Sequence, residues 1–258
     1  GGIAPGKLAD ILIFDDLKKI KPSKVFVGGK LVASNGSIVA PVKKKTIPSW
    51  IKNTVKIKKF SNTDFEIKSK KKKVDVNTIS LQTEIITKLG STDLEVSDGL
   101  VQPSLDKDVW KVAAFDRIHG TKNHVIGFLE NFGANIGAFA STWSFHENDL
   151  IIIGSNDSDM ALAANTLRKT QGGLVVANSG KIDALLPLSL AGIISTDPFD
   201  KVSSNFEKVN NIIVDSGCKF SRPHLIPLFL PFLALPSVRI LSKGIVDVKK
   251  REYINPIN

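Results

Sequence analysis

The chain has 258 residues, of which 42% are hydrophobic and 23% are charged. A chain of this size buries roughly 70–75% of the surface that its unfolded form exposes, so we expect a full hydrophobic core. The longest apolar run, Leu225 to Leu235, contains Pro227 and Pro231 and is shorter than the ~20 residues of a membrane-spanning helix, so we predict no membrane partner.

The formal net charge of +10 comes from 35 basic and 25 acidic residues, and the excess lies in three lysine-rich stretches, at residues 43–45, 56–59 and 68–73. Arginine reads bases and phosphates better than lysine does, and stacking aromatics are not interleaved here, so we interpret the stretches as solvated surface and predict no nucleic-acid partner. The single cysteine, Cys218, excludes an intrachain disulfide and favours a reducing cytoplasm.

The first 41 residues carry strand signals. An apolar strand is predicted at residues 8–14, and residues 24–27 and 30–33 flank a two-residue hairpin turn at Gly28-Gly29. A sheet this small cannot bury both of its faces, so it needs the rest of the molecule or another partner, and its exposed edges favour a homo-oligomer. Residues 42–60 are basic, contain Pro48 and are predicted to be a linker into a second domain.

The second domain alternates strand and helix signals. Strands are predicted within 74–89 and at 110–115, 123–132, 150–153 and 244–248, with a hairpin formed by 174–177 and 181–186. Ser155 and Asp157 are candidate caps for a helix at 157–170 that would end in a left-handed Gly172-Gly173. A second helix follows Pro198 and carries the apolar stripe Phe199, Val202, Phe206, Val209 and Ile213. The pattern predicts an α+β fold with a largely antiparallel sheet and flanking helices.

The best place to look for chemistry is the polar segment at residues 144–149, directly before the apolar strand at 150–153. Glu147 and Asp149 are too close in sequence to be assigned as an acid and base pair without geometry, because carboxylate roles depend on separation in space.

The beginning of the chain resembles a known family. Residues 3–13, with Ala4-Pro5-Gly6 and Ala9-Asp10, and the hairpin at 25–32 are similar to the closing segment of the amidohydrolase superfamily. The resemblance implies that residues 1–45 are the C-terminal strands of a composite β-sandwich that accompanies a metal-binding barrel, and that residues 46–258 are a separate α+β domain.

The remaining motifs resemble the C-terminal half of bacterial and archaeal adenine deaminases. They are Pro48-Ser49-Trp50, Asp116-Arg117-Ile118-His119-Gly120-Thr121, Gly137 to Thr142, Gly154 to Ala161, Gly172 to Val176 and Phe232 to Pro236. The resemblance implies hydrolysis of adenine to hypoxanthine and ammonia, with divalent ions (Mn, Fe or Zn) on a barrel that this chain caps and that belongs either to the same polypeptide or to a separate chain. It implies that the catalytic residues lie on that barrel, that this chain binds no metal, and that the chain alone is inactive.

The same resemblance gives the candidate substrate-facing residues, which are Arg117, His119, His146, Glu147 and Asn148. Phe145, His146 and Asn148 stand where the family usually has histidine, aspartate and histidine, so a divergent homologue with another substrate or no activity is the alternative. Arg117 is an ion-pair partner or an anchor for the site loop, and His119 is a packing residue or faces the site. A nucleic-acid-binding module is a third hypothesis.

Overall fold

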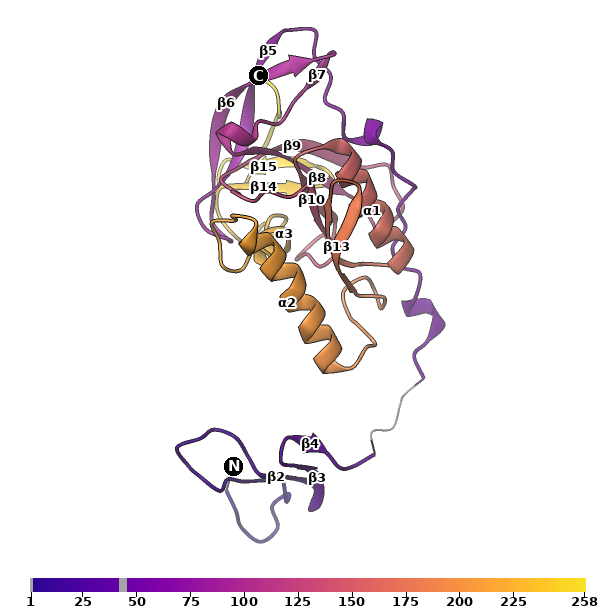
Figure 1. Cartoon of the computed structure of the whole chain (residues 1–258), viewed down its shortest axis with the longest axis vertical. Helices are drawn as coiled ribbons and strands as arrows, with labels where there is room; N and C mark the ends of the chain where they lie inside the picture. The colour runs from indigo at the N-terminus through magenta and orange to yellow at the C-terminus, as the bar shows by residue number, and fades with distance from the viewer. Residues whose placement is uncertain (1, 42–45) are drawn as a thin grey trace. The chain divides into compact units, whose positions relative to one another are not determined.

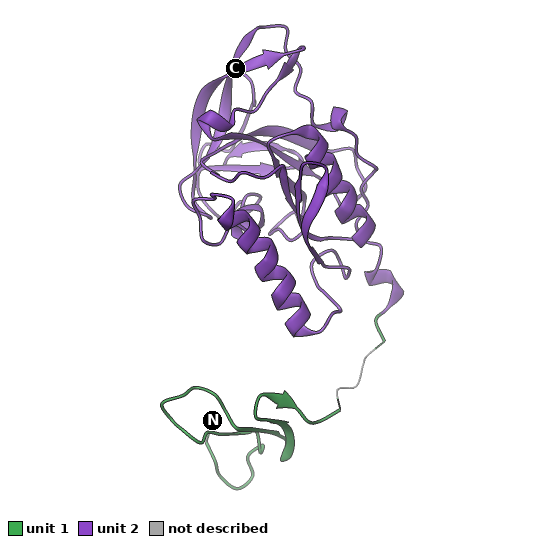
Figure 2. Cartoon of the chain, in the orientation of Figure 1, with its two compact units in different colours: residues 1–47 green, residues 48–258 purple. Residues whose placement is uncertain are grey.

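The computed structural model describes residues 2–41 and 46–258, which fall into two compact units divided between Ile47 and Pro48 (Figure 2). Unit 1 is a four-stranded antiparallel sheet of β1 (Ile11–Ile13), β2 (Lys24–Val27), β3 (Lys30–Ser34) and β4 (Ser37–Ile38). The predicted hairpin is confirmed, with φ of 56° at Gly28 and 76° at Gly29, which are left-handed values that glycine adopts readily.

The first strand is shorter than the predicted 8–14. Its partner β2 turns away at Gly28, and the Gly28 N–H donates to the Asp10 carboxylate at 2.7 Å instead of extending the ladder. Several apolar side chains of this unit are exposed among the described residues, including Leu8, Leu12, Val27 and Ile38. This unit therefore has apolar surface available for a partner.

Unit 2 is built on a nine-stranded sheet in the order β13-β12-β10-β11-β8-β9-β5-β6-β7. Every neighbouring pair is antiparallel except β5 with β9, so the predicted α+β class with a largely antiparallel sheet is confirmed. The strands are β5 (Lys73–Leu81), β6 (Thr87–Ser97), β7 (Leu100–Val101), β8 (Val109–Phe115), β9 (His124–Glu130), β10 (Ala138–Ser141), β11 (Leu150–Gly154), β12 (Gly173–Asn178) and β13 (Lys181–Pro187).

The remaining elements of unit 2 lie around this sheet (Figure 1). They are α1 (Asp157–Thr170), α2 (Phe199–Asp215), α3 (Leu225–Phe229), the small sheet β14 (Val238–Leu241), β15 (Gly244–Asp247) and β16 (Glu252–Ile254), and the 3-10 turns η1 (Ser49–Ile51), η2 (Asn62–Phe65) and η3 (Leu105–Lys107). In the described residues, none of the helices is long and apolar enough to cross a membrane.

The strand β11 shows why the middle strands of the sheet are mostly apolar. Leu150 and Ile152 pack with α1 on one face, whereas Ile151 and Ile153 pack with α2, α3 and the small sheet on the other. Because side chains alternate between faces, a strand covered on both sides needs a continuous apolar run rather than an alternating one.

Three local predictions are wrong. Residues 55–60 are not a linker, since Val55 and Phe60 are only 5% and 4% exposed and Phe60 packs against Phe115 of the sheet. The cap of α1 is Asn156, whose side chain accepts from the Asp159 N–H, and the left-handed residue after the helix is Gln171. Phe199 is 82% exposed because it starts α2 beyond the end of the sheet, although Val209 and Ile213 are buried as predicted.

Candidate functional site

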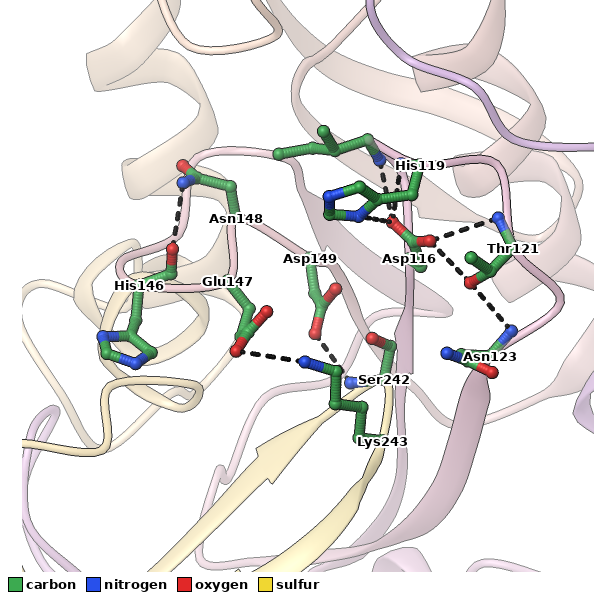
Figure 3. A network of polar contacts seen from close by, with 11 residues as sticks. Asp116, His119, Thr121, Asn123, His146, Glu147, Asn148, Asp149, Ser242 and Lys243 are labelled. Atoms are coloured by element: carbon green, nitrogen blue, oxygen red, sulfur yellow. Dashed lines mark hydrogen bonds and ion pairs between the residues drawn. The ribbon is translucent and has the colours of Figure 1, made fainter.

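The polar residues gather at one edge of the central sheet because the register brings two connections together there. Phe115 at the end of β8 pairs with Leu150 at the start of β11. The β8–β9 connection (residues 116–123) and the β10–β11 connection (142–149) therefore leave the sheet side by side, and the β14–β15 turn at Ser242-Lys243 joins them (Figure 3). We call these three segments the polar edge.

Asp116 organises the first connection. Its carboxylate accepts from the Ile118 and His119 N–H groups, both at 3.0 Å, and from the Thr121 N–H at 3.2 Å and hydroxyl at 2.5 Å. Burial alone would raise the pKa of Asp116, but these donors outweigh it and hold the pKa well below its usual range. The carboxylate is therefore ionised at neutral pH and fixes the backbone of the connection.

The same carboxylate orients His119. The His119 Nδ1 lies 3.3 Å from the Asp116 Oδ1, while the side chain is 70% exposed. A carboxylate at Nδ1 favours the tautomer that carries its proton there, which leaves Nε2 free to accept a proton or a hydrogen bond. Of the two alternatives, packing and site-facing, this exposure is compatible with the second.

The second connection is held by packing and by local backbone conformation. Phe145 lies against Phe229 and Phe232, with ring centroids 5.0 and 5.5 Å apart, and its N–H donates to the Leu228 carbonyl. His146 and Asn148 both have positive φ, at 70° and 54°. The aromatic contact therefore fixes a turn that presents His146 to solvent.

The connection ends at Asp149, which is buried and accepts from the Ser242 N–H at 2.6 Å. Burial raises the pKa of this carboxyl, and the nearby Glu147 and Asp116 charges add to the effect. Glu147 faces Lys243 across the same turn, with 3.5 Å between Oε1 and Nζ. Two acidic residues thus tie the β10–β11 connection to the β14–β15 turn.

Arg117 is buried beneath the polar edge, with 1% of its surface exposed. Its guanidinium donates to the Ala191 carbonyl at 3.1 Å, and its Nε has no partner among the described residues. Desolvation lowers the pKa of Arg117 to about 10, against the opposing effect of Asp149 and Asp116. These contacts tie Arg117 to the segment after β13, and its predicted role as an anchor for the site loop stays a prediction.

The structure thus brings Arg117 and His119 onto one connection and His146, Glu147 and Asn148 onto its neighbour. Sequence reasoning missed Asp116 as the organiser, although an acid followed by Thr121 at a strand end is a recognisable turn signal. It also missed Ser242 and Lys243, which lie about a hundred residues further along and give no local signal. In the described residues, His, Cys, Asp and Glu side chains do not gather in groups of three or more that could hold a metal ion.

Comparisons with known proteins identify relatives. The family profile described as "Adenine deaminase C-terminal domain" matches residues 84–252. Curated relatives named "Adenine deaminase" include one from Cenarchaeum symbiosum (strain A), 52% identical over 254 residues, and one from Clostridium botulinum (strain Langeland), 36% identical over 258 residues. A third, from Moorella thermoacetica, is 33% identical over 261 residues.

The alignments cover 98%, 99% and 100% of this chain but only 42%, 43% and 44% of the respective relatives. The chain therefore spans less than half the length of these relatives. The profile match covers most of unit 2, including the whole polar edge. The chain belongs to the adenine deaminase C-terminal domain family.

Proposed function

We propose that this chain is the C-terminal part of an adenine deaminase, which hydrolyses adenine to hypoxanthine and ammonia, and that the polar edge faces an active site supplied by the rest of the protein. The observation that carries the proposal is the alignment: nearly the whole of this chain aligns with less than half the length of each relative named adenine deaminase. The fixed, exposed His119 supports the assignment of the facing edge.

In this proposal unit 1 contributes strands to a β-sandwich completed by the rest of the protein, and its exposed apolar residues are the surface that the sandwich buries. Divalent metal ions would be held by the rest of the protein, since the described residues here do not fit a metal site. When bound, such ions lower the pKa of a water molecule and so supply the hydrolytic nucleophile.

The role of this chain is then to shape the entrance through which the substrate reaches the active site. His119 offers an Nε2 acceptor, and Glu147 and Lys243 offer a charged pair that a small polar ligand can contact. His146 and Asn148 lie on the same turn as Glu147. These groups orient a purine or exclude water without taking part in the bond-breaking step.

The test is a comparison of two proteins, the 258-residue chain and the longer polypeptide that contains it. We expect metal-dependent formation of hypoxanthine from adenine by the longer protein and none by the chain alone. Metal-dependent turnover by the isolated chain would overturn the capping role, and an inactive, folded and metal-loaded longer protein would overturn the deaminase assignment.

Within the longer protein, His119→Ala should lower kcat/KM by about 10- to 100-fold if His119 positions the substrate. Lys181→Ala is the matched control, because Lys181 is exposed and begins β13 at the opposite edge of the sheet. Equal effects of the two substitutions would argue against a substrate-facing polar edge.

A second candidate is a relative that acts on another amine or on none. It is favoured by Phe145, which is engaged with Phe229 and Phe232 and has no group that can exchange a proton. A panel of purines offered to the longer protein separates the two, since a preference for a purine other than adenine would support this candidate. Homo-oligomerisation and a cytoplasmic location are further parts of the proposal, and gel filtration and cell fractionation test them.

A further inference from the structure

A cavity lies between residues 56–60 and the β8–β9 connection, and His119 does not line it. It is a cavity of about 410 Å³ within unit 2, and this volume falls in the range of roughly 300–1,000 Å³ typical of small-molecule sites. Its walls combine aromatic, lysine and small polar side chains. The residues that line it and carry the argument are Lys56, Phe60, Phe115, Lys122, Asn123 and His124.

Both walls of this cavity are fixed by hydrogen bonds. On one side, the Lys56 N–H donates to the Arg117 carbonyl at 2.7 Å, and both backbone groups of Phe60 bond to the Asn165 side chain at 2.9 Å. On the other side, Asp116 holds the Thr121 backbone and hydroxyl. The cavity is therefore built into the fold and needs no rearrangement to form.

The floor of the cavity is aromatic. The His124 ring stacks on Phe115 with centroids 5.2 Å apart and an interplanar angle of 3°, and Phe60 meets Phe115 edge-on at 4.8 Å. His124 is exposed, so the stack ends at solvent and offers flat surface to a planar ring. Asn123 adds a side-chain amide, which carries both donors and an acceptor for the edge of such a ring.

The rim is cationic. Lys56 and Lys122 are exposed and form no ion pair within residues 2–41 and 46–258, whereas Lys58 pairs with Asp64. The Asp116 carboxylate also lines the cavity, but it already accepts hydrogen bonds from Ile118, His119 and Thr121 of its own connection. An ammonium group is a compact point charge that binds phosphate well, so the free lysines favour an anionic group on the ligand.

We propose that this cavity binds a phosphorylated planar heterocycle of the size of a nucleoside monophosphate. The ring lies against His124 and Phe60 with its edge at Asn123, and the phosphate lies between Lys56 and Lys122. The cavity shares the β8–β9 connection with the polar edge, but neither His119 nor any residue of 142–149 lines it. It gives a role to the lysine stretch at 56–59 that the deaminase proposal leaves unused.

The inference goes beyond the proposed function and predicts regulation of it. Within the β8–β9 connection, Thr121 and Asn123 line the cavity and His119 does not. His119 and Thr121 lie on either side of the Asp116 carboxylate (Figure 3). A ligand held by Asn123 and Lys122 contacts the same short segment that positions the imidazole. Occupation of the cavity is therefore expected to shift the position of His119.

The test is direct binding to the 258-residue chain by titration calorimetry, with AMP, adenosine and inorganic phosphate as separate probes. We expect AMP to bind, and adenosine and phosphate each to bind at least about 10-fold more weakly. Adenosine lacks the phosphate that the lysines contact, and inorganic phosphate lacks the planar ring. Failure of AMP to bind, or phosphate or adenosine binding as tightly as AMP, overturns the proposal. Deaminase activity is not measured, so the result is independent of the proposed function.

Two variants and one spectrum locate the site. The double substitution Lys56→Ala with Lys122→Ala should weaken AMP binding about 10-fold or more, whereas Lys249→Ala with Lys250→Ala, which removes the same charge elsewhere, should not. Equal weakening by both pairs would mean non-specific attraction and reject the site. AMP should also shift the amide NMR signals of residues 120–124 in the unmodified chain, and shifts confined to other segments would reject it as well.

Discussion

Asp116 and Asp149 stand immediately beyond the same ladder pair, Phe115 with Leu150, and yet their carboxyl pKa values move in opposite directions. Both are nearly inaccessible, with 8% and 2% of their surface exposed. Asp116 accepts from several donors of its own connection, whereas the Asp149 carboxylate accepts from the Ser242 backbone. Burial raises the pKa of both carboxyls, and only at Asp116 do the hydrogen-bond donors outweigh it.

For Asp116 we expect the substitution Asp116→Asn to lower the free energy of unfolding by about 1–3 kcal/mol at pH 7, because an amide cannot accept from all the donors. The native pKa is below the unfolded value, so this contribution is complete above the unfolded pKa of about 3.9 and is lost as pH falls through the native pKa. Urea denaturation between pH 3 and 7 measures it. Asp106→Asn, at an exposed site, is the control. An Asp116→Asn effect that grows on acidification would contradict the assignment.

For Asp149 the sign is reversed. Its native pKa is above the unfolded value, so the wild type is favoured at low pH and loses stability as pH rises from the unfolded pKa through the native one. Asp149→Asn removes this titration and can keep the Ser242 bond through its amide oxygen. We expect the variant to gain stability relative to the wild type as pH rises from 4 to 7, in the same denaturation series. If the difference in free energy of unfolding between the variant and the wild type stays constant with pH, Asp149 does not titrate in this way.

For Arg117 the informative comparison is Arg117→Ala against Arg117→Met. Alanine leaves a void and an unpaired Ala191 carbonyl, so we expect a loss of about 2–4 kcal/mol. Methionine fills most of the void and removes the unpartnered buried Nε, so its cost should be smaller. Hydrogen exchange at the Ala191 N–H, which donates to the Ile51 carbonyl at 3.0 Å, should accelerate more in the alanine variant. Identical losses in both variants would mean that packing by Arg117 is unimportant.

For Phe145 we expect Phe145→Ala to release the β10–β11 connection while leaving the sheet intact. The side chain is 41% exposed, so the global loss should be only about 1 kcal/mol. The local effect should be larger and visible as faster hydrogen exchange at the Phe145 N–H, which bonds the Leu228 carbonyl. Ile118→Ala, 36% exposed on the other connection, is the control. Unchanged exchange in Phe145→Ala would show that the backbone alone holds the turn.

Sequence patterns predicted the elements whose signal is local. The helix at 157–170 and the strand at 150–153 were found nearly as predicted, because apolar periodicity and run length specify them. The strands β10, β14 and β16 were missed, since each is short and its identity depends on a partner strand distant in sequence. Residues 55–60 resemble a linker in composition, and only the burial of Val55 and Phe60 in the folded domain shows otherwise.

The parts of the candidate site that lie next to predicted strands could be predicted from the sequence, whereas their tertiary partners could not. His119 follows the predicted strand at 110–115 and the 144–149 segment precedes the predicted strand at 150–153, so the two meet at one sheet edge once these strands pair antiparallel. The partners Ser242 and Lys243 come from a hairpin whose position against the sheet is a matter of tertiary packing. The cavity beside Phe115 was not predicted, because it requires the chain at 56–60 to fold back over β8 and β9.

The ladder from Phe115–Leu150 to Lys111–Gly154 is complete without any residue of the two connections that it brings together. Exchanges at the more exposed positions 118–120 and 145–148 would therefore leave the pairing of β8 with β11 unchanged, whereas the buried Arg117 and Ser144 have to be kept. Natural variation at such positions can change the chemistry of the edge while the rest of the domain folds as before. A laboratory library restricted to these positions should yield mostly folded proteins with altered ligand preference.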